Sequence, residues 1–310
     1  MEHTSGENEH LPIIDLSQIG PETGDRLVEA ASKWGFLYIR NQGLGFDTAV
    51  MDRIFGLSGQ FFKSPIEEKK AVTIGSDDKG WSPPYAEVLD PENQQQGDFK
   101  EFVVFTIWRS IDDAKGGKHW FSSRHDYSKG PSGTILRFNY YPYLGVETSG
   151  SLEDANGIIR GASHTDFGSM TLLFQRASQP GLEIQNPESS WSPVAVFPPG
   201  TENDALPPIV VNIGDLLNHW TNGLLKSTVH RVNIPKVNKE DRYSIAYFCH
   251  PIASTELIPI PSKIVSGMGN AIFQGEEVGA TKKAMTAKEH LHNRLAAVYG
   301  WGKENSGEVA

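Results

Sequence analysis

Cysteine is almost absent from this chain of 310 residues, in which Cys249 is the only one. An internal disulfide and a thiol-rich metal site are therefore excluded, and we expect a reducing, cytoplasmic location. The sequence also lacks any apolar run near the roughly 20 residues that a membrane-spanning helix needs. Its first residues, MEHTSGENEH, lack the basic and apolar regions of a secretory signal. These absences predict a protein with no membrane partner.

Positive charge is scarce as well. The formal net charge is −10 and the pI is about 5.5, and no run of lysine and arginine forms a basic patch. Nucleic acids and anionic membranes would repel such a chain, so we expect neither as a partner. The GxSxG motif of a serine hydrolase is absent too, which argues against that class of enzyme. The sequence leaves the oligomeric state open.

Hydrophobic residues make up 38% of the chain, enough for a sizeable core. We expect disordered polar tails at residues 1–10 and 303–310 and a single domain over residues 11–302. Residues 11–75 are predicted to be mostly helical, because apolar residues recur at helical spacing in DRLVEAASKW and AVMDRIFGLSGQFF. An amphipathic C-terminal helix is predicted over residues 286–301.

Residues 100–275 differ from this in composition and pattern, with frequent glycine and proline between short β-rich runs. These runs are EFVVFTIW, TILRFNYYP, SMTLLFQ, GLEIQN, PIVVNIGDLL, TVHRVNIP and RYSIAYFCH. Short strands at this spacing favour a β-sandwich or barrel over alternating βαβ units. We therefore predict a mainly β fold, with flanking α-helices packed on one β core.

The stretch GASHTDFGSM carries the first candidate site residues, His164 and Asp166. On a strand, residues two apart point to the same face, so both side chains would project inward and Thr165 would point away. His230, in the later strand-like run STVHRVNIP, could join them. Two imidazoles and one carboxylate are the ligands of non-haem Fe(II) oxygenases, although zinc could take the same set.

A second pair with the same spacing, Arg242 and Ser244, lies in DRYSIAYF. A guanidinium fork with a neighbouring hydroxyl suits the bidentate capture of a carboxylate. A co-substrate with a 2-oxo acid at one end and a carboxylate at the other could therefore chelate iron and anchor its tail here. Taken alone, an arginine at such a position usually pairs with a surface acid.

These motifs together resemble the iron(II)/2-oxoglutarate-dependent dioxygenase family, in its isopenicillin N synthase-like branch. The resemblance covers roughly residues 11 to 300, where LPIIDLS, GFLYIRNQG, FKSPIEEKK, GDFKEFVVF, LRFNYYP, GLEIQN, VVNIGDLLNHW and DRYSIAYFCHP occur in the family's order. It implies a double-stranded β-helix (jelly-roll) core with N-terminal and C-terminal helices packed on it.

The resemblance also implies a reaction. Fe(II), 2-oxoglutarate and O2 would be required, and succinate and CO2 would be released as a small-molecule substrate is hydroxylated, desaturated or cyclised, in specialised metabolism. In LRFNYYP, the family pattern NxYP assigns Asn139 and Tyr141 to 2-oxoglutarate binding. Both could instead be turn residues before Pro142. The presence of Asp166 argues against halogenation, because halogenating relatives lack this carboxylate.

Several residues that flank the motifs are candidate substrate contacts, although aromatic residues near strands are more often part of a core. These candidates are Trp81, Tyr85, Phe105, Arg160, Phe167 and Phe248. Three other functions stay open at this point. They are a same-fold Fe(II) oxidase that uses O2 without 2-oxoglutarate, as isopenicillin N synthase does, a hydrolase, and a non-catalytic jelly-roll binding module. The sequence does not name the substrate.

Overall fold

The structure is a computed structural model that describes most of the chain. The described residues are 10–17, 20–41, 44, 46–75, 79–90, 94, 97–105, 121–143, 153–154, 157–235, 240–258, 260, 265 and 284–299. The tails predicted at 1–10 and 303–310 lie outside them, apart from His10. The limits predicted for a single domain therefore stay a prediction.

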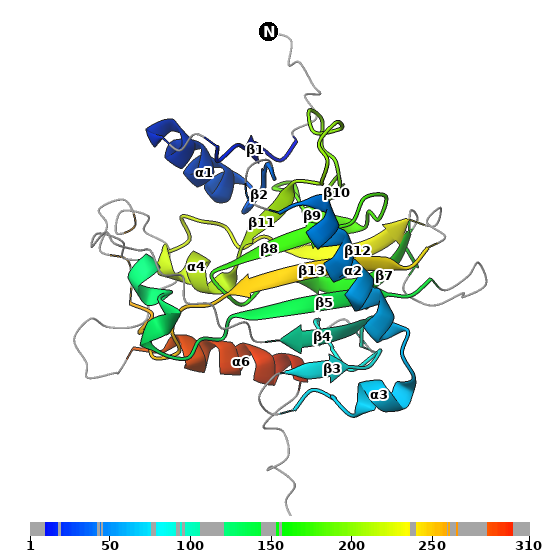
Figure 1. The fold of residues 1–310 in the computed structure, drawn as a ribbon. Helices are drawn as coiled ribbons and strands as arrows, with labels where there is room; N and C mark the ends of the chain where they lie inside the picture. The colour runs from blue at the N-terminus through cyan, green and yellow to red at the C-terminus, as the bar shows by residue number, and fades with distance from the viewer. Residues whose placement is uncertain are drawn as a thin grey trace, which may run out of the picture.

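Two sheets form the centre of the molecule (Figure 1). The larger has the strand order β1-β2-β11-β8-β13-β5-β4-β3, and the smaller has the order β10-β9-β12-β7-β6. Neighbouring strands run antiparallel, except for the parallel pair β1 and β2. This arrangement of two sheets with flanking helices confirms the predicted jelly-roll class.

The strands are short, as the sequence predicts. Those of the larger sheet are β1 (Ile13–Ile14), β2 (Phe36–Ile39), β11 (Ile209–Ile213), β8 (Met170–Gln175), β13 (Arg242–Cys249), β5 (Ile135–Tyr141), β4 (Glu101–Phe105) and β3 (Gly80–Ser82). Those of the smaller sheet are β10 (Trp191–Pro193), β9 (Leu182–Gln185), β12 (His230–Pro235), β7 (Gly157–His164) and β6 (Glu153–Asp154).

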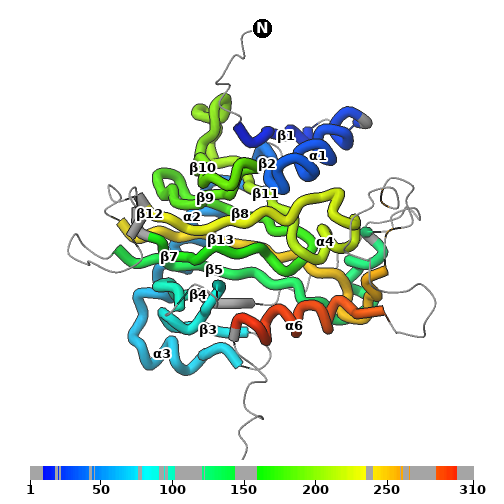
Figure 2. The backbone as a smooth tube through the Cα atoms, turned by 180° about the vertical axis from the view of Figure 1, so that it is seen from behind, coloured from blue at the N-terminus to red at the C-terminus, as the bar shows by residue number. Residues whose placement is uncertain are grey.

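Helices flank the sheets on several sides (Figures 1 and 2). They are α1 (Pro21–Lys33), α2 (Thr48–Phe62), α3 (Ile66–Lys70), α4 (Asp215–Trp220) and α6 (Ala287–Tyr299), with 3-10 turns η1 (Ser122–Arg124) and η2 (Tyr127–Lys129). The predicted C-terminal helix corresponds to α6. Within the described part of the chain, none of these helices has the length and apolar character needed to span a bilayer.

The larger sheet has different chemistry on its two faces. Alternate residues of β13, including Tyr243 and Ile245, point outward and pack with Phe55 and Phe62 of α2 in one buried cluster. Asp47 begins this helix as its N-cap, and its carboxylate accepts a hydrogen bond from the backbone N–H of Val50 at 2.7 Å. Because α2 covers the outer face, the intervening polar residues of β13 point into the space between the sheets.

Candidate active site

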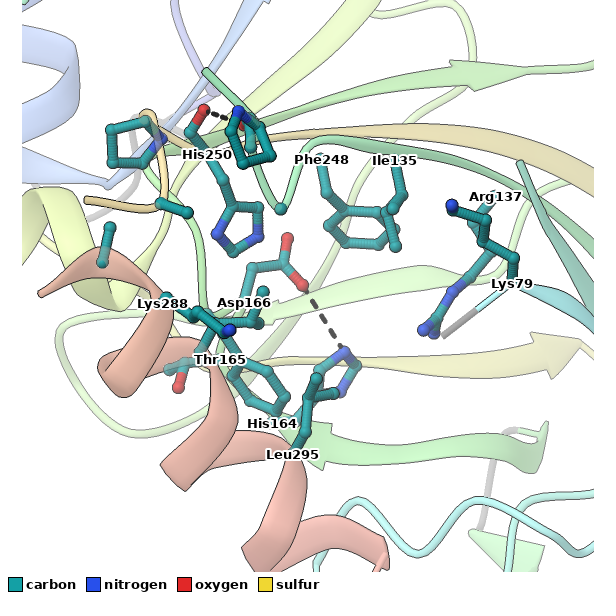
Figure 3. Close-up of a pocket in the computed structure, with 18 of the residues that line it drawn as sticks. Lys79, Ile135, Arg137, His164, Thr165, Asp166, Phe248, His250, Lys288 and Leu295 are labelled. Atoms are coloured by element: carbon teal, nitrogen blue, oxygen red, sulfur yellow. Dashed lines mark hydrogen bonds and ion pairs between the residues drawn. The ribbon is translucent and has the colours of Figure 1, made fainter. Parts of the chain in front are cut away.

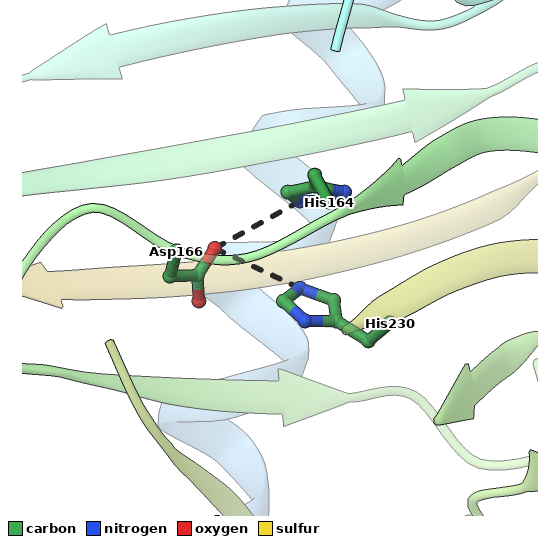
Figure 4. Close-up of side chains that lie close together, drawn as sticks. All are labelled: His164, Asp166 and His230. Carbon is green, nitrogen blue, oxygen red and sulfur yellow. Dashed lines mark ion pairs between the residues drawn. The ribbon is translucent and has the colours of Figure 1, made fainter. Parts of the chain in front are cut away.

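The two histidines of the predicted triad come from neighbouring strands of the smaller sheet. His164 ends β7 and His230 begins β12, and the two residues lie directly opposite each other in the antiparallel ladder. Their ring centroids are 4.4 Å apart. The register of the ladder shifts immediately after His230, which marks an irregularity at the site. Figure 4 shows both rings turned toward the carboxylate of Asp166.

Asp166 does not lie on the strand that carries His164, because β7 ends at His164. The prediction that His164 and Asp166 share one strand face was therefore wrong, although the two side chains do lie close together. Asp166 Oδ1 lies 3.8 Å from His164 Nε2 and 3.7 Å from His230 Nε2. The chain turns after His164, and the backbone oxygen of Asp166 accepts a hydrogen bond from the N–H of Asp215 at 2.7 Å.

The larger sheet fixes the other oxygen of this carboxylate. Asp166 Oδ2 accepts a hydrogen bond from Asn212 Nδ2 at 2.7 Å and a short one from Thr171 Oγ1. Asn212 and Thr171 are directly opposite each other on β11 and β8. The carboxylate is therefore held by two strands of one sheet while its Oδ1 faces the two histidines of the other.

Backbone carbonyls set the tautomer of both histidines. His164 Nδ1 lies 2.8 Å from the carbonyl oxygen of Ala162, and His230 Nδ1 lies 3.2 Å from that of Thr228. Since a carbonyl can only accept, each Nδ1 carries the proton and each Nε2 keeps its lone pair. The Nε2 atoms are the ones that face Asp166.

The protonation states match a metal centre. Burial, with a smaller contribution from His230, lowers the pKa of His164 to about 4, so its imidazole is neutral at pH 7. Burial alone would raise the pKa of Asp166. The neighbouring histidines and the hydrogen bonds from Asn212 and Thr171 outweigh it and hold the pKa below its usual value. Two imidazole nitrogens and one carboxylate oxygen, all within 4.8 Å of one another, fit a ferrous ion.

The predicted carboxylate anchor lies on the inner face of the larger sheet. Arg242 is directly opposite Tyr141, and Ser244 is directly opposite Asn139, so the four residues form two cross-strand pairs on one face. Asn139 Nδ2 lies 3.5 Å from Ser244 Oγ. The alternative interpretation of Asn139 and Tyr141 as turn residues does not hold, because both are buried within β5.

Arg242 is a buried cation with an incomplete set of partners. Only 1% of the residue is exposed, and no ion pair to a described carboxylate involves it. Its Nε donates to the carbonyl oxygen of Pro180 at 3.1 Å, and its guanidinium lies 5.0 Å from the centroid of the Tyr141 ring. Its Nη1 is buried with no partner among the described groups. Such a cation fits an anion that the chain itself does not supply.

A glycine lets the backbone approach this cation. Gly181 has φ +140, a conformation that side-chain-bearing residues rarely adopt, and a Cβ there would come within 3.3 Å of Arg242 Nε. Burial lowers the pKa of Arg242 from its ordinary value, but the group remains a cation at neutral pH.

A cavity of about 360 Å³ opens beside the triad. His164 and Asp166 lie at one side of it, and Ile135 and Phe248 line it from the inner face of the larger sheet. Leu291 and Leu295 of α6 close another side. In Figure 3, Lys288 of α6 lies across the cavity from Arg137 and Lys79.

One wall of this cavity carries a buried network of charges. Glu87 pairs with Arg137 Nη1 at 3.1 Å and with Lys100 Nζ at 2.7 Å, and Lys100 also pairs with Asp98 at 2.8 Å. Burial would raise the pKa of Glu87, but Arg137 and Lys100 lower it to about 2. Asp98 Oδ1 in turn accepts a hydrogen bond from the N–H of Ala162, the residue whose carbonyl orients His164.

Neither this network nor the place of His250 in the cavity lining was predicted from the sequence. Burial lowers the pKa of His250 to about 3, so that ring is neutral. One signal for Arg137 was available, because it precedes Asn139 by two residues in LRFNYYP and must share its strand face. Glu87 lies in a segment without a regular pattern, and only the folded structure brings it to Arg137.

Two of the predicted substrate contacts, Phe167 and Phe248, line the cavity. Trp81 does not. It is 2% exposed in the cluster on the outer face of the sheet, and its Nε1 donates to Glu101 Oε2 at 2.8 Å. Its prediction as a substrate contact is therefore wrong, because the strand alternation of β3 turns it toward α2.

Two further candidates lie away from the cavity. Tyr85 is 44% exposed, packs against Phe99 and does not line this cavity. Arg160 is buried, its guanidinium donates to the carbonyl oxygens of Phe99 and Pro142, and it is not among the residues that line this cavity. The roles of Tyr85 and Arg160 as substrate contacts therefore stay predictions that this cavity does not support. The remaining candidate, Phe105, ends β4, and its side chain lies outside what the structure describes.

Comparisons with known proteins agree with this geometry. Residues 132–251 match the model of the 2OG-Fe(II) oxygenase superfamily, and residues 11–123 match that of the non-haem dioxygenase in morphine synthesis N-terminal region. The proline hydroxylase buaE of Petromyces alliaceus is 36% identical over 94% of this chain and 100% of its own. The UPF0676 protein C1494.01 of Schizosaccharomyces pombe is 32% identical over 97% of this chain and 98% of its own.

Solved structures give the same result. A full-length protein of Neurospora crassa, crystallised in complex with alpha-KG, is similar with a TM-score of 0.67 and 25% identity, over 96% of this chain and 99% of that one. The same Neurospora crassa protein with alpha-KG and thymine has a TM-score of 0.67 and 26% identity, over 94% of this chain and 98% of that one. These relatives support 2-oxoglutarate use and leave the isopenicillin N synthase-like branch as a loose label.

Proposed function

We propose that His164, Asp166 and His230 hold the ferrous ion of this chain, which belongs to the family of iron(II)- and 2-oxoglutarate-dependent oxygenases. As a member of this family, the chain is an oxidoreductase that uses both iron and 2-oxoglutarate. One observation carries this proposal. Asp166 Oδ1 and the two Nε2 atoms face one another within 4.8 Å, with the second carboxylate oxygen already hydrogen-bonded. Two imidazoles and one carboxylate leave open positions on an octahedral ion for 2-oxoglutarate and O2.

The cradle on β13 and β5 is proposed to hold 2-oxoglutarate. The Arg242 guanidinium and the Ser244 hydroxyl would bind its distal carboxylate, because Arg242 Nη1 is buried and has no partner among the described groups. Asn139 and Tyr141, directly opposite them, can donate further hydrogen bonds to its oxygens. The bound metal and co-substrate together supply the oxidising chemistry, in which 2-oxoglutarate and O2 become succinate, CO2 and the oxygen equivalent that oxidises the substrate.

The cavity beside the triad is proposed to hold a small-molecule substrate. Its volume of about 360 Å³ suits a compact molecule. Ile135, Phe248 and Leu291 offer an apolar surface that excludes water, while Arg137 can orient a polar end of the substrate. The Neurospora crassa structure with thymine and the relative named as a proline hydroxylase support a substrate of this size. Hydroxylation, desaturation and ring formation in specialised metabolism all suit the site.

The setting of the enzyme is also part of the proposal. A reducing compartment such as the cytoplasm would keep the iron ferrous and suits a chain with one cysteine. The net charge of −10 supports the absence of nucleic-acid and anionic-membrane partners.

An anaerobic binding experiment tests the two assignments separately. Fe(II) and then 2-oxoglutarate are added to the purified protein, and the visible charge-transfer band of the chelate is recorded. Asp166→Ala should lose iron retention. Arg242→Ala should keep iron but need about a hundredfold more 2-oxoglutarate, because a charged hydrogen-bonded partner is lost. Arg26→Ala, which removes an exposed guanidinium on α1, is the control.

Two results would contradict the proposal. If Asp166→Ala kept its iron, the triad would not be the metal site. If Arg242→Ala lowered only the melting temperature, the cradle would have a structural role. Oxygen uptake with and without 2-oxoglutarate then separates this enzyme from a same-fold oxidase, since uptake should require the co-substrate.

A further inference from the structure

Gln175, the last residue of β8, is a buried amide without partners among the described groups. Only 4% of the residue is exposed. Neither its Nε2 nor its Oε1 forms a hydrogen bond with any described group. A buried amide that loses its hydrogen bonds to water and gains none destabilises the folded state. The fold therefore carries this residue at a cost to its own stability.

The strand register places Gln175 beside the proposed 2-oxoglutarate cradle. Gln175 is directly opposite Ser244 of β13, and Ser244 is directly opposite Asn139 of β5. Residues that oppose one another in antiparallel strands point to the same face, with Cβ atoms about 4.5–5.5 Å apart. Gln175, Ser244 and Asn139 thus form one row on the inner face. Arg242, whose Nη1 has no described partner, lies two residues before Ser244 on the same face.

A second buried glutamine shows how this chain treats a structural amide. Gln179 is 5% exposed, four residues after Gln175. Its Nε2 donates to the carbonyl oxygen of Asp241 at 2.9 Å, and its Oε1 accepts from the N–H of Tyr243 at 2.8 Å. Both of its polar atoms are used within the fold. The unused amide of Gln175 therefore differs in kind from that of its neighbour.

We propose that Gln175 is a further 2-oxoglutarate-binding residue, whose Nε2 donates a hydrogen bond to the distal carboxylate held by Arg242 and Ser244. The inference rests on the proposed function, because it needs that carboxylate in the cradle. A carboxylate has about four lone-pair sites, so an arginine fork and one hydroxyl leave room for an amide donor. The unpaired amide thus keeps a donor ready for the co-substrate, at the expense of the stability of the ligand-free protein.

Two glutamine-to-leucine variants test this inference. In Gln175→Leu, an apolar side chain of similar size replaces an amide that the ligand-free fold does not use. Its ligand-free melting temperature should equal or exceed that of the wild type. Gln179→Leu leaves the Tyr243 N–H and the Asp241 carbonyl unpaired, so its melting temperature should fall. The two variants should therefore differ in the sign of their effect.

Binding is measured on the same proteins by anaerobic titration of the Fe(II)-loaded chain with 2-oxoglutarate. Gln175→Leu should raise the Kd for 2-oxoglutarate about tenfold, which corresponds to about 1.4 kcal/mol, with iron affinity unchanged. An unchanged Kd would overturn the inference. A raised Kd together with a melting temperature lowered as in Gln179→Leu would overturn it too, since the effect would then be structural.

Arg242→Ala, measured in the same titration, separates this inference from the proposed function. If Arg242→Ala weakens 2-oxoglutarate binding and Gln175→Leu does not, only the role of Gln175 is wrong. If Arg242→Ala itself leaves the Kd unchanged, the cradle is wrong, and the role of Gln175 is overturned with it.

Discussion

Asp166 illustrates how a single side chain depends on partners from distant parts of the chain. One oxygen faces His164 and His230, and the other accepts hydrogen bonds from Asn212 and Thr171. These two donors fix the direction in which Oδ1 points. Groups that orient a metal ligand in this way commonly change metal affinity by roughly 10–100-fold when they are removed.

Thr171→Val tests this orientation, because it removes the hydroxyl and keeps the shape of the side chain. We expect Fe(II) affinity to fall about tenfold, with less change in the global stability, as the carboxylate gains freedom to rotate. Metal titration under anaerobic conditions measures the affinity. Thr165→Val is a matched control, since Thr165 Oγ1 donates to Asp215 and not to Asp166. Equal losses in the two variants would show that Thr171 does not act through the carboxylate.

At the scale of elements, α6 forms a wall of the cavity and is tied to the loops beside the triad. Arg294 pairs with Asp215 of α4 at 2.8 Å and lies 4.6 Å from the centroid of the Phe167 ring. His290 Nε2 lies 3.2 Å from the carbonyl oxygen of Phe167. Leu291 and Leu295 of the same helix line the cavity. The position of the helix therefore depends on contacts made by its polar side.

Arg294→Ala should loosen α6 and leave the metal site intact. We expect amide hydrogen exchange to become several-fold faster over residues 287–299, because an ion pair and a ring contact are lost. The effect on total stability should be small, since this arginine is partly exposed. Amides of α2, on the opposite face of the sheet, serve as the internal reference. Equal acceleration in both helices would mean a global effect and contradict this view of α6.

The elements themselves could largely be predicted from the sequence, because their signals are local. Alternation in DRYSIAYFC identifies β13 and assigns Arg242 and Ser244 to the face opposite Tyr243. The strand that was expected to run through both His164 and Asp166 ends at His164. Asp166 is held beyond the strand by hydrogen bonds from Thr171, five residues along the chain, and from the distant Asn212, and the alternation of the strand does not record such contacts.

The cavity was less predictable than the triad for the same reason. Glu87 and Arg137 are ion-paired across a long stretch of chain, and Glu87 belongs to no periodic segment. Arg160 precedes the HxD motif and was expected near the substrate, but carbonyl oxygens from two other segments bind its guanidinium. Trp81 shows the limit for aromatic residues, whose burial in a core or a pocket depends on the packing of helices such as α2.

At the scale of the whole molecule, each sheet supplies a different part of the site. The smaller sheet contributes His164 and His230, and the larger sheet contributes Arg242 and Ser244 together with the groups that hold Asp166. The stability of this arrangement depends on buried charges between the sheets, among them Glu87 with Arg137 and Lys100.

The stability contributed by Glu87 should depend on pH. Its pKa is lowered from 4.5 to about 2 in the folded chain. The contribution is therefore fully present above pH 4.5 and is lost as the pH falls toward 2, by up to about 3 kcal/mol. Urea unfolding of the wild type and of Glu87→Gln, at steps from about pH 6 to about pH 3, measures it. The difference in unfolding free energy between the two should shrink as the pH falls.

Glu188→Gln is the control for that experiment, because Glu188 is exposed and forms no ion pair with another described residue. The difference in unfolding free energy between Glu188→Gln and the wild type should stay small over the whole pH range. A difference between wild type and Glu87→Gln that is independent of pH would mean that the ion pairs of Glu87 do not stabilise the fold.

The most direct test of the proposed site is a crystal structure of the protein with Mn(II), as a stand-in for Fe(II), and 2-oxoglutarate. We predict the metal bound to Nε2 of His164, Nε2 of His230 and Oδ1 of Asp166, with the distal carboxylate of 2-oxoglutarate on Arg242 Nη1. A metal bound elsewhere, or a co-substrate whose carboxylate does not reach Arg242, would contradict this assignment.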